Sequence, residues 1–255
     1  MFHKDIVFKT EQNYLDAKLE LPIPAKLNIP DWFKKLNHTR DKKTVKGCIP
    51  FLDSLTAGYL IKLPCDLEIK HNVVNPETGK RDGHQCSSLV TNGKYVEDLG
   101  LSVNYRPESQ QAFQIEGSPL LKKNKDLPVH KIMNPWVIKT PPGYSCLFTA
   151  PFNNKDDRFE IITGIVDTDT YNLPVHFPFI VNGDKYNELN TIIKKGTIVA
   201  QVIPFKRESW KMSIKTLKRN EHKINSVKLF TQFINMYKDN FWNKKNGFKK
   251  LHKNL

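Results

Sequence analysis

Two stretches rich in β-branched residues constrain the fold of this chain most strongly. Residues 161–182 read IITGIVDTDTYNLPVHFPFIVN, and residues 192–205 read IIKKGTIVAQVIPF. β-Branched and aromatic residues favour extended strands, whereas Gly, Pro, Asn and Asp favour the turns between them. The pattern predicts a strand over 161–166, a second over 175–181, and a third that follows a Lys-Lys-Gly turn.

Polar side chains interrupt these predicted strands at defined places. Asp167 and Asp169 follow the first strand directly, and Gln201 lies inside the third. Functional side chains are often placed at strand ends, which makes Asp167 the first candidate for a site residue. Asp is also common in turns that it merely shapes, and a buried Gln amide usually has hydrogen-bond partners within the protein. Both interpretations of these three residues stay open.

Length and composition favour a folded β protein. The 255 residues are 39% hydrophobic and 11% aromatic, which is enough for a packed core and excludes a disordered chain. No apolar run approaches the roughly 20 residues that span a bilayer. The beginning, MFHKDIVFKTEQ, lacks the basic and apolar regions of a signal peptide. We therefore expect a cytoplasmic protein without a membrane segment.

The formal charge of +14 arises from 40 Lys and Arg residues against 26 Asp and Glu residues. Such an excess favours polyanionic partners, such as phosphorylated small molecules or nucleic acid. An AT-rich genome would also produce a lysine-rich chain without selection for binding. Charge alone does not separate these two explanations.

No metal site is predicted from the cysteines. They are scattered along the chain, and His84-x-Cys86 supplies two ligands where zinc needs three or four. The cysteines are Cys48, Cys65, Cys86 and Cys146.

The remaining pattern divides the chain into three parts. Residues 1–49 form an irregular N-terminal extension with a short helix predicted over 31–36 (DWFKKL). Residues 50–205 form a β domain, in which strands are predicted from Cys48 onwards and the arrangement of residues 84–130 is left open. Within it, Pro141-Pro142-Gly143 predicts a sharp turn, followed by a strand over 144–149. Residues 206–255 form a basic helical extension.

That C-terminal extension carries an aromatic helix pattern. Over residues 219–242 large apolar residues recur every three or four positions, which predicts a helix that buries one face. The last twelve residues, KKNGFKKLHKNL, hold five lysines and no acidic residue. A solvated tail and a nucleic-acid-binding arm are both compatible with that composition. Trp136 and Trp210 are predicted to be packing anchors.

Four stretches, in this order, resemble the motifs of the dUTPase/dCTP-deaminase family of trimeric β-barrel proteins. They are TAGY at 56–59, PPGY at 141–144, GIVDTD at 164–169 and GTIVAQ at 196–201. The resemblance covers about residues 50–205. It implies a mainly β fold with a distorted barrel or jelly-roll core, followed here by a C-terminal helix. The chain also resembles uncharacterised proteins of marine bacteriophages, which would place it in the host cytoplasm or in a virion.

The resemblance implies roles for six residues. Asp167 would be the catalytic base that activates a water molecule towards a nucleotide phosphate. Tyr171 would contact the sugar and Gln201 a phosphate. Asp169, Gly58 and Tyr59 would complete the nucleotide contacts, and Mg²⁺ would be required only if hydrolysis is retained.

The chain departs from the family pattern at the positions that hold phosphate. Leu60 replaces the Asp of the first motif, residues 150–153 (APFN) replace the Arg-Ser pattern of the second, and Thr170 precedes Tyr171 where the family has Tyr-Arg-Gly. The glycine-rich C-terminal arm is missing. Loss of Arg removes strong charge-assisted bonds to phosphate, for which Arg158 or lysines would have to substitute.

Three functions follow from these observations. The leading hypothesis is a phage-type dUTPase-like trimer with a degenerate pyrophosphatase site, which binds a nucleotide or phosphate or acts as a structural module. The second is an active Mg-dependent deoxynucleotide hydrolase or deaminase with a rebuilt site. The third is a nucleic-acid-binding protein that uses its basic C-terminal segment.

Overall fold

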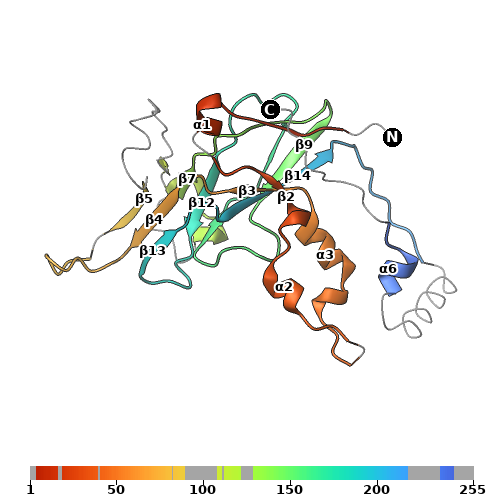
Figure 1. Ribbon diagram of the computed structural model, residues 1–255, viewed down its shortest axis with the longest axis horizontal. Coiled ribbons are helices and arrows are strands. Elements are labelled where there is room, and N and C mark those ends of the chain that lie inside the picture. The colour runs from red at the N-terminus through yellow and green to blue at the C-terminus, as the bar shows by residue number, and fades with distance from the viewer. Residues whose placement is uncertain are drawn as a thin grey trace. The chain divides into compact units, whose positions relative to one another are not determined.

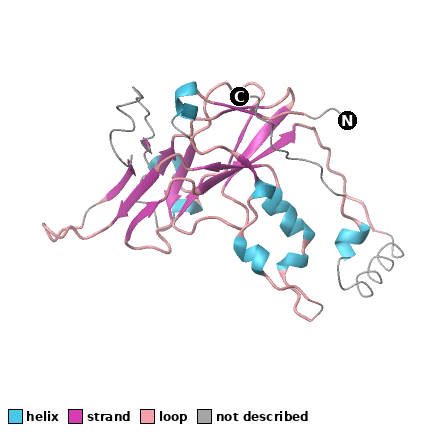
Figure 2. Ribbon diagram, viewed as in Figure 1, coloured by secondary structure: helices cyan, strands magenta, loops and turns pink. Residues whose placement is uncertain are grey.

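The computed structural model describes residues 4–16, 19–39, 41–81, 83–89, 108–110, 112–121, 129–217 and 236–243. The protein is mainly β, as predicted, with antiparallel sheets and a short C-terminal helix (Figures 1 and 2). The chain forms two compact units, and each is treated by itself. The β unit holds Met1–Ile23 and Tyr59–Lys206, and the helical unit holds Pro24–Gly58 and Arg207–Leu255.

The largest sheet of the described chain has five strands in the order β11-β9-β14-β3-β2. Its centre is β14 (Ile198–Lys206), which pairs antiparallel with β9 (Tyr144–Thr149) on one edge and with β3 (Tyr59–Lys62) on the other. β11 (Gly164–Val166) pairs with β9, and β2 (Ile23–Pro24) completes the sheet. The strands predicted over 161–166 and after the Lys-Lys-Gly turn are confirmed, although the first is split into β10 and β11.

Smaller sheets complete the described part of the β unit. The first has the order β10-β12-β7-β6, the second β13-β4-β5, and the third pairs β1 with β8. Their strands are β10 (Phe159–Ile161), β12 (Phe177–Val181), β7 (Val129–Ile132), β6 (Glu108–Gln110), β13 (Leu189–Ile193), β4 (Asp66–His71), β5 (His84–Leu89), β1 (Val7–Lys9) and β8 (Val137–Lys139). Short helices lie at α1 (Gln12–Asp16), η3 (Ala112–Ile115) and η4 (Pro119–Leu121).

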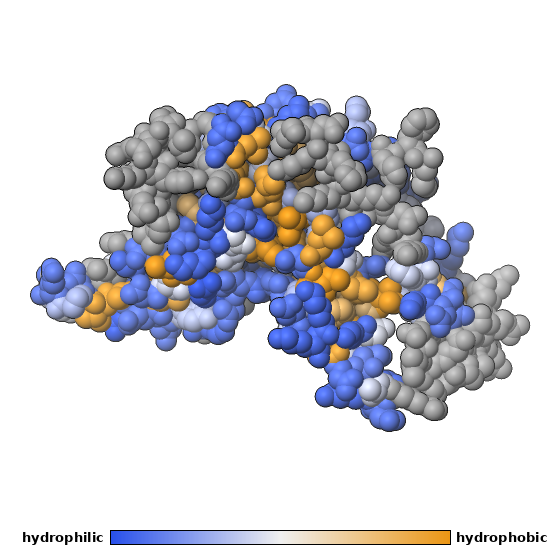
Figure 3. All heavy atoms as spheres, viewed as in Figure 1, coloured by the Kyte–Doolittle hydropathy of each residue, from blue (hydrophilic) through white to orange (hydrophobic). Residues whose placement is uncertain are grey.

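The β unit packs around aromatic and β-branched side chains from several sheets. Phe148 on β9 packs against Phe177 on β12, with ring centroids 6.0 Å apart, and Phe159 packs edge-on against Phe179 at 5.7 Å. Trp136 is buried, which confirms its prediction as a packing anchor. Each such side chain contributes about 1.5–3 kcal/mol by burial, so this core fixes how the sheets pack. On the face drawn in Figure 3, most of the described surface is hydrophilic, with smaller hydrophobic areas between charged side chains.

The predicted turn over 141–144 lies just before β9. Gly143 has φ +82°, a left-handed conformation that favours glycine, and the Tyr144 amide donates to the Pro141 carbonyl at 3.2 Å. Gly196 has φ +84° in the Lys-Lys-Gly turn that precedes β14. Both turn predictions are therefore confirmed.

The helical unit contains α2 (Asp31–Lys35) and α3 (Ile49–Thr56), together with the 3-10 turns η1 (Ala25–Leu27) and η2 (Val45–Gly47). The short helix predicted near residue 31 is confirmed, and Phe33 stacks on Phe51 of α3 at 5.9 Å. The prediction of strands from Cys48 onwards is wrong for residues 49–56. Pro50 lies in the first turn of α3, where a missing amide hydrogen has no cost, and α3 buries Ile49 and Leu55.

Near the C-terminus, α6 (Met236–Asn240) is helical, and Trp242 Nε1 donates to Asp53 Oδ2 at 3.3 Å within the helical unit. Most of the predicted helix over 219–242, and the basic tail over 244–255, lie outside the described residues. Trp210 is 87% exposed, so its prediction as a packing anchor is wrong: it lies in residues 207–217, which form no helix or strand. Among the described residues no helix has the length and apolar character needed to cross a bilayer.

A buried histidine lies within β7. His130 is 4% exposed, and its ring lies 5.5 Å from that of Phe179. Burial disfavours the charged imidazolium and lowers the pKa of His130 from 6.5 to about 4.

We expect Gly143→Ala to lower the free energy of unfolding by about 1–2 kcal/mol, because an added Cβ is strained at φ +82°. Gly83→Ala is the matched control, since an added Cβ would meet no atom within 4 Å at either glycine. Urea unfolding of both variants measures the difference. Equal stability of the two variants would show that the turn tolerates a side chain.

His130 should make stability depend on pH. Above pH 6.5 the imidazole is neutral in the folded and unfolded states. As the pH falls from 6.5 to about 4, only the unfolded chain takes up the proton, so the free energy of unfolding should fall by up to about 3 kcal/mol. His130→Phe keeps a ring but removes the titration, so urea unfolding across this range should show a smaller loss in the variant. Equal losses would contradict a buried neutral His130.

Candidate functional site

The four motif-like stretches contribute neighbouring strands to one sheet. β3 begins at the end of the first stretch, β9 follows the second, β11 lies in the third and β14 lies in the fourth. The order β11-β9-β14-β3 places them side by side, although they are far apart in the sequence. This sheet therefore carries the four stretches from which the predicted site residues come.

Asp167 follows β11, and its carboxylate is tied to the neighbouring strand. Its Oδ1 atom accepts a hydrogen bond of 2.6 Å from Ser145 Oγ on β9, and Ser145 is fully buried. Its backbone carbonyl accepts the amide hydrogens of Thr170 at 3.1 Å and Tyr171 at 2.9 Å. Asp167 is exposed as a residue, yet it shapes the turn that follows β11 and holds that turn to β9.

Asp169 joins the same turn to the Pro-Pro-Gly turn. Its Oδ2 atom accepts the backbone amide hydrogen of Gly143 at 2.8 Å. Lys139 on β8 donates from Nζ to the carbonyl of Asp169 at 2.9 Å and to Asn172 Oδ1 at 2.8 Å. The ammonium group therefore donates its hydrogen bonds to uncharged oxygens of this turn.

Beneath these turns lies a cluster of small polar side chains. The hydroxyl oxygens of Thr140 and Thr168 are 2.7 Å apart, and Thr168 Oγ1 donates to Cys146 Sγ at 3.3 Å. Burial raises the pKa of Cys146 to about 11, so the group is a neutral thiol at physiological pH. The cluster fastens the turns and supplies no thiolate nucleophile.

Gln201 lies inside β14 and is 1% exposed. Its Oε1 atom accepts the backbone amide hydrogen of Phe152 at 2.9 Å. Phe152 belongs to the 150–153 stretch (APFN). The Gln201 carboxamide thus holds the 150–153 turn in place from within β14.

Gly58, Tyr59 and Tyr171 lie in different surroundings. Gly58 has φ +67°, and its carbonyl accepts the Ala25 amide hydrogen at 3.0 Å within the helical unit. In the β unit the Tyr59 ring packs on Phe8 at 5.3 Å, and burial, followed by the charge of Asp5, raises its pKa. Tyr171 is 40% exposed.

Arg158 does not lie open for a phosphate. Its guanidinium donates to both carboxylate oxygens of Asp156, at 2.9 and 2.7 Å, and to Thr191 Oγ1 at 2.8 Å. The pKa of Arg158 is raised first by these bonds to Asp156. The described residues contain no cluster of three or more His, Cys, Asp or Glu side chains that could hold a metal ion.

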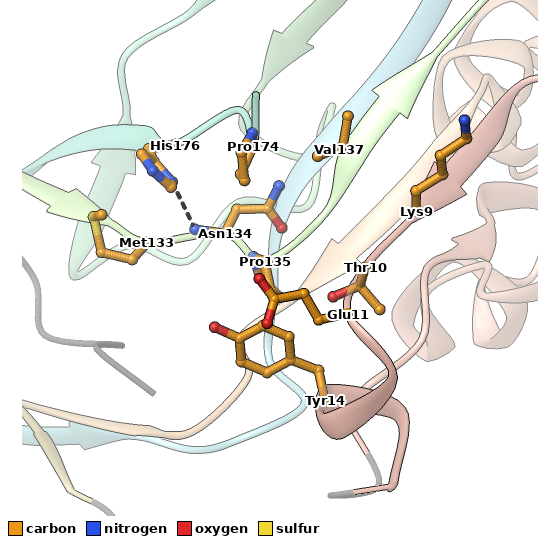
Figure 4. A pocket seen from close by; sticks show the side chains of 10 residues that line it. All are labelled: Lys9, Thr10, Glu11, Tyr14, Met133, Asn134, Pro135, Val137, Pro174 and His176. Atoms are coloured by element: carbon orange, nitrogen blue, oxygen red, sulfur yellow. Dashed lines mark hydrogen bonds between the residues drawn. The ribbon is translucent and has the colours of Figure 1, made fainter. Parts of the chain in front are cut away.

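The β unit contains a pocket that the sequence did not indicate (Figure 4). Its volume is about 390 Å³, within the range of small-molecule sites. The lining residues come from three separate stretches without a shared motif, which explains why spacing gave no signal. They are Lys9, Thr10, Glu11, Tyr14, Met133, Asn134, Pro135, Val137, Pro174 and His176.

Comparison of the chain with protein-family models, with curated proteins and with solved structures gives no match in any of the three.

A double-mutant cycle tests the structural use of Asp167. Because Ser145 Oγ and Asp167 Oδ1 form a short charge-assisted bond, Asp167→Ala should lower the free energy of unfolding by about 1.5–3 kcal/mol. In the Ser145→Ala background the same change should cost much less, because its partner is already gone. Asp184→Ala, at an exposed turn, serves as the control. Additive losses in the cycle would contradict a coupled pair.

Proposed function

We propose that this chain is a divergent dUTPase-like β-barrel protein that forms a trimer and serves as a structural module without pyrophosphatase turnover. Adjacency of the four motif strands supports the family part of the proposal. If the four short stretches resembled the motifs only by chance, there would be no reason for β11, β9, β14 and β3 to be neighbours in one sheet. No family model or solved structure adds support, so the proposal rests on motif order and on this topology.

The hydrogen bonds of the candidate residues support the absence of turnover. Asp167, Asp169 and Gln201 bind Ser145 Oγ, the Gly143 amide and the Phe152 amide respectively. A catalytic base must accept a proton from water beside the reacting phosphate, and electrostatic catalysis needs cationic donors around that phosphate. Here one oxygen of each carboxylate accepts a protein hydrogen bond, and Arg158 is paired with Asp156.

Pyrophosphate release from each common deoxynucleoside triphosphate, with and without Mg²⁺, tests the catalytic part. We expect no release above background, and no difference between the wild type and Asp167→Asn. Light scattering of the full chain tests the oligomeric part, for which we expect three times the monomer mass. Turnover that requires Mg²⁺ and is lost in Asp167→Asn but kept in Asp184→Asn would establish a hydrolase instead.

Thermal shift with the same nucleotides separates a structural module from a nucleotide-binding one. A ligand at 100 times its Kd stabilises a folded protein by about 2.7 kcal/mol, which moves its melting temperature measurably. We expect no shift with any of them. A shift of the melting temperature without turnover, abolished by Asp167→Asn, would show that the sheet carries a nucleotide-binding site. A monomer in light scattering would contradict the resemblance to a family of trimers.

A further inference from the structure

The excess of positive charge belongs to one of the two units. The helical unit contains 20 Lys and Arg residues against 6 Asp and Glu residues, whereas the β unit contains 20 against 20. The net charge of the chain, +14, is therefore the net charge of the helical unit, and the β unit is neutral. An AT-rich genome would raise the lysine content of both units alike. The uneven distribution thus favours binding of a polyanion over a purely compositional origin of the charge.

The described cations of the two units also differ in their ion pairs. In the β unit, Lys62 pairs with Glu20 at 3.0 Å and Lys194 pairs with Asp66 at 2.9 Å. In the helical unit, five exposed lysines form no ion pair with another described residue. They are Lys26, Lys35, Lys42, Lys211 and Lys215. Like charges without counter-charges repel one another, and a bound polyanion would relieve that repulsion.

Lysines gather at the end of α2. Lys34 and Lys35 form the last turn of this helix, and Lys46 Nζ donates to the carbonyls of Lys34 at 2.7 Å and Leu36 at 3.0 Å. Lys34 pairs with Asp31, which is the only acidic residue of this helix. The backbone therefore holds three ammonium groups near one carboxylate, which leaves a local positive charge for an anion.

Exposed tryptophans accompany these cations. Trp32 on α2 packs edge-on against Phe33 at 5.7 Å and Phe51 at 6.0 Å, yet it is 41% exposed. Trp210 is 87% exposed and precedes Lys211 in residues 207–217, which Figure 2 draws as a loop after β14. Aromatic rings interleaved with cations are typical of surfaces that bind single-stranded nucleic acid, where bases stack on the rings and cations bind the phosphates.

We propose that the helical unit binds single-stranded nucleic acid. Lysines of residues 26–46 and 207–217 neutralise phosphates, and Trp32 and Trp210 stack on bases. Every base has a flat face, so the binding does not depend on sequence. An acidic protein would match the charge but offers no row of flat bases to the two indole rings. The inference does not depend on the family proposed above, because none of these residues belongs to the four motif-like stretches.

Three polyanions test the proposal by fluorescence anisotropy with the full chain. They are an oligothymidylate of about 20 nucleotides, a DNA duplex of the same length, and a polyglutamate with the same number of charges. We expect the oligothymidylate to bind most tightly. Its affinity should fall about 50-fold between about 50 and 200 mM salt, as expected for about four neutralised phosphates.

The duplex has the higher charge density, so tighter binding of the single strand isolates the contribution of base stacking. An oligouridylate of the same length distinguishes RNA from DNA as the source, and tighter binding of either single strand supports the proposal. Equal or tighter binding of the duplex or of polyglutamate, or no saturable binding of either single strand, would overturn it.

Lysine variants locate the binding. Lys211→Ala combined with Lys215→Ala should weaken the oligothymidylate about tenfold and make the salt dependence shallower, because two phosphate contacts are lost. Lys9→Ala combined with Lys80→Ala removes the same charge from exposed positions of the β unit and should leave the affinity nearly unchanged. Equal losses in the two double variants would place the binding outside the helical unit and overturn the assignment.

Tryptophan variants test the stacking. Trp210→Ala should weaken the oligothymidylate about fivefold or more. Met212→Ala is the matched control, because Met212 is 84% exposed in the same segment but has no ring, and it should leave the affinity unchanged. Both side chains are exposed, so the melting temperature should stay the same in both variants. Equal affinities of the two variants would contradict a stacked Trp210 and overturn the single-strand assignment.

Discussion

The structure of the β unit depends on β14. This nine-residue strand pairs with β9 along one edge and with β3 along the other, and Val199–Val202 are buried as a continuous run. The backbone groups of such a strand are shielded from water. If a hydrogen bond to a neighbouring strand is lost, water cannot replace it, so the pairing of the strand is strongly favoured. Pairing of β14 therefore brings all four motif-like stretches together.

Around this strand, the carboxylate and carboxamide side chains that were candidates for catalysis stabilise turns instead. Asp167 and Asp169 fix the turn after β11 to Ser145 on β9 and to the Gly143 amide, and Gln201 fixes the Phe152 amide from inside β14. A carboxylate that accepts one strong hydrogen bond from a buried donor stabilises its turn, and the same bond reduces its availability to a substrate. Structural and catalytic uses of a side chain thus compete at this edge of the sheet.

Net charge is a poor guide to the local chemistry of this chain. An excess of 14 positive charges predicts polyanionic partners, yet the lining of the described pocket carries both a cation, Lys9, and a carboxylate, Glu11. Net charge acts over the whole surface, whereas the recognition of a small ligand depends on a few oriented atoms within hydrogen-bond distance. The net charge of the chain therefore does not identify the ligand class of the pocket.

The sequence by itself determined the mainly β class, the turns at Gly143 and Gly196, the strands on either side of them and the short helix at α2, because turn chemistry and β-branched runs act locally. It did not predict α3, where a composition typical of strands is overruled by Pro50 in the first turn and by packing of Phe51 on Phe33. Only the tertiary structure decided that Ser145 is the partner of Asp167 and that Thr10 and Asn134 line one pocket. Such contacts join residues from separate strands, and the pairing of strands is set by long-range packing, which local propensity does not encode.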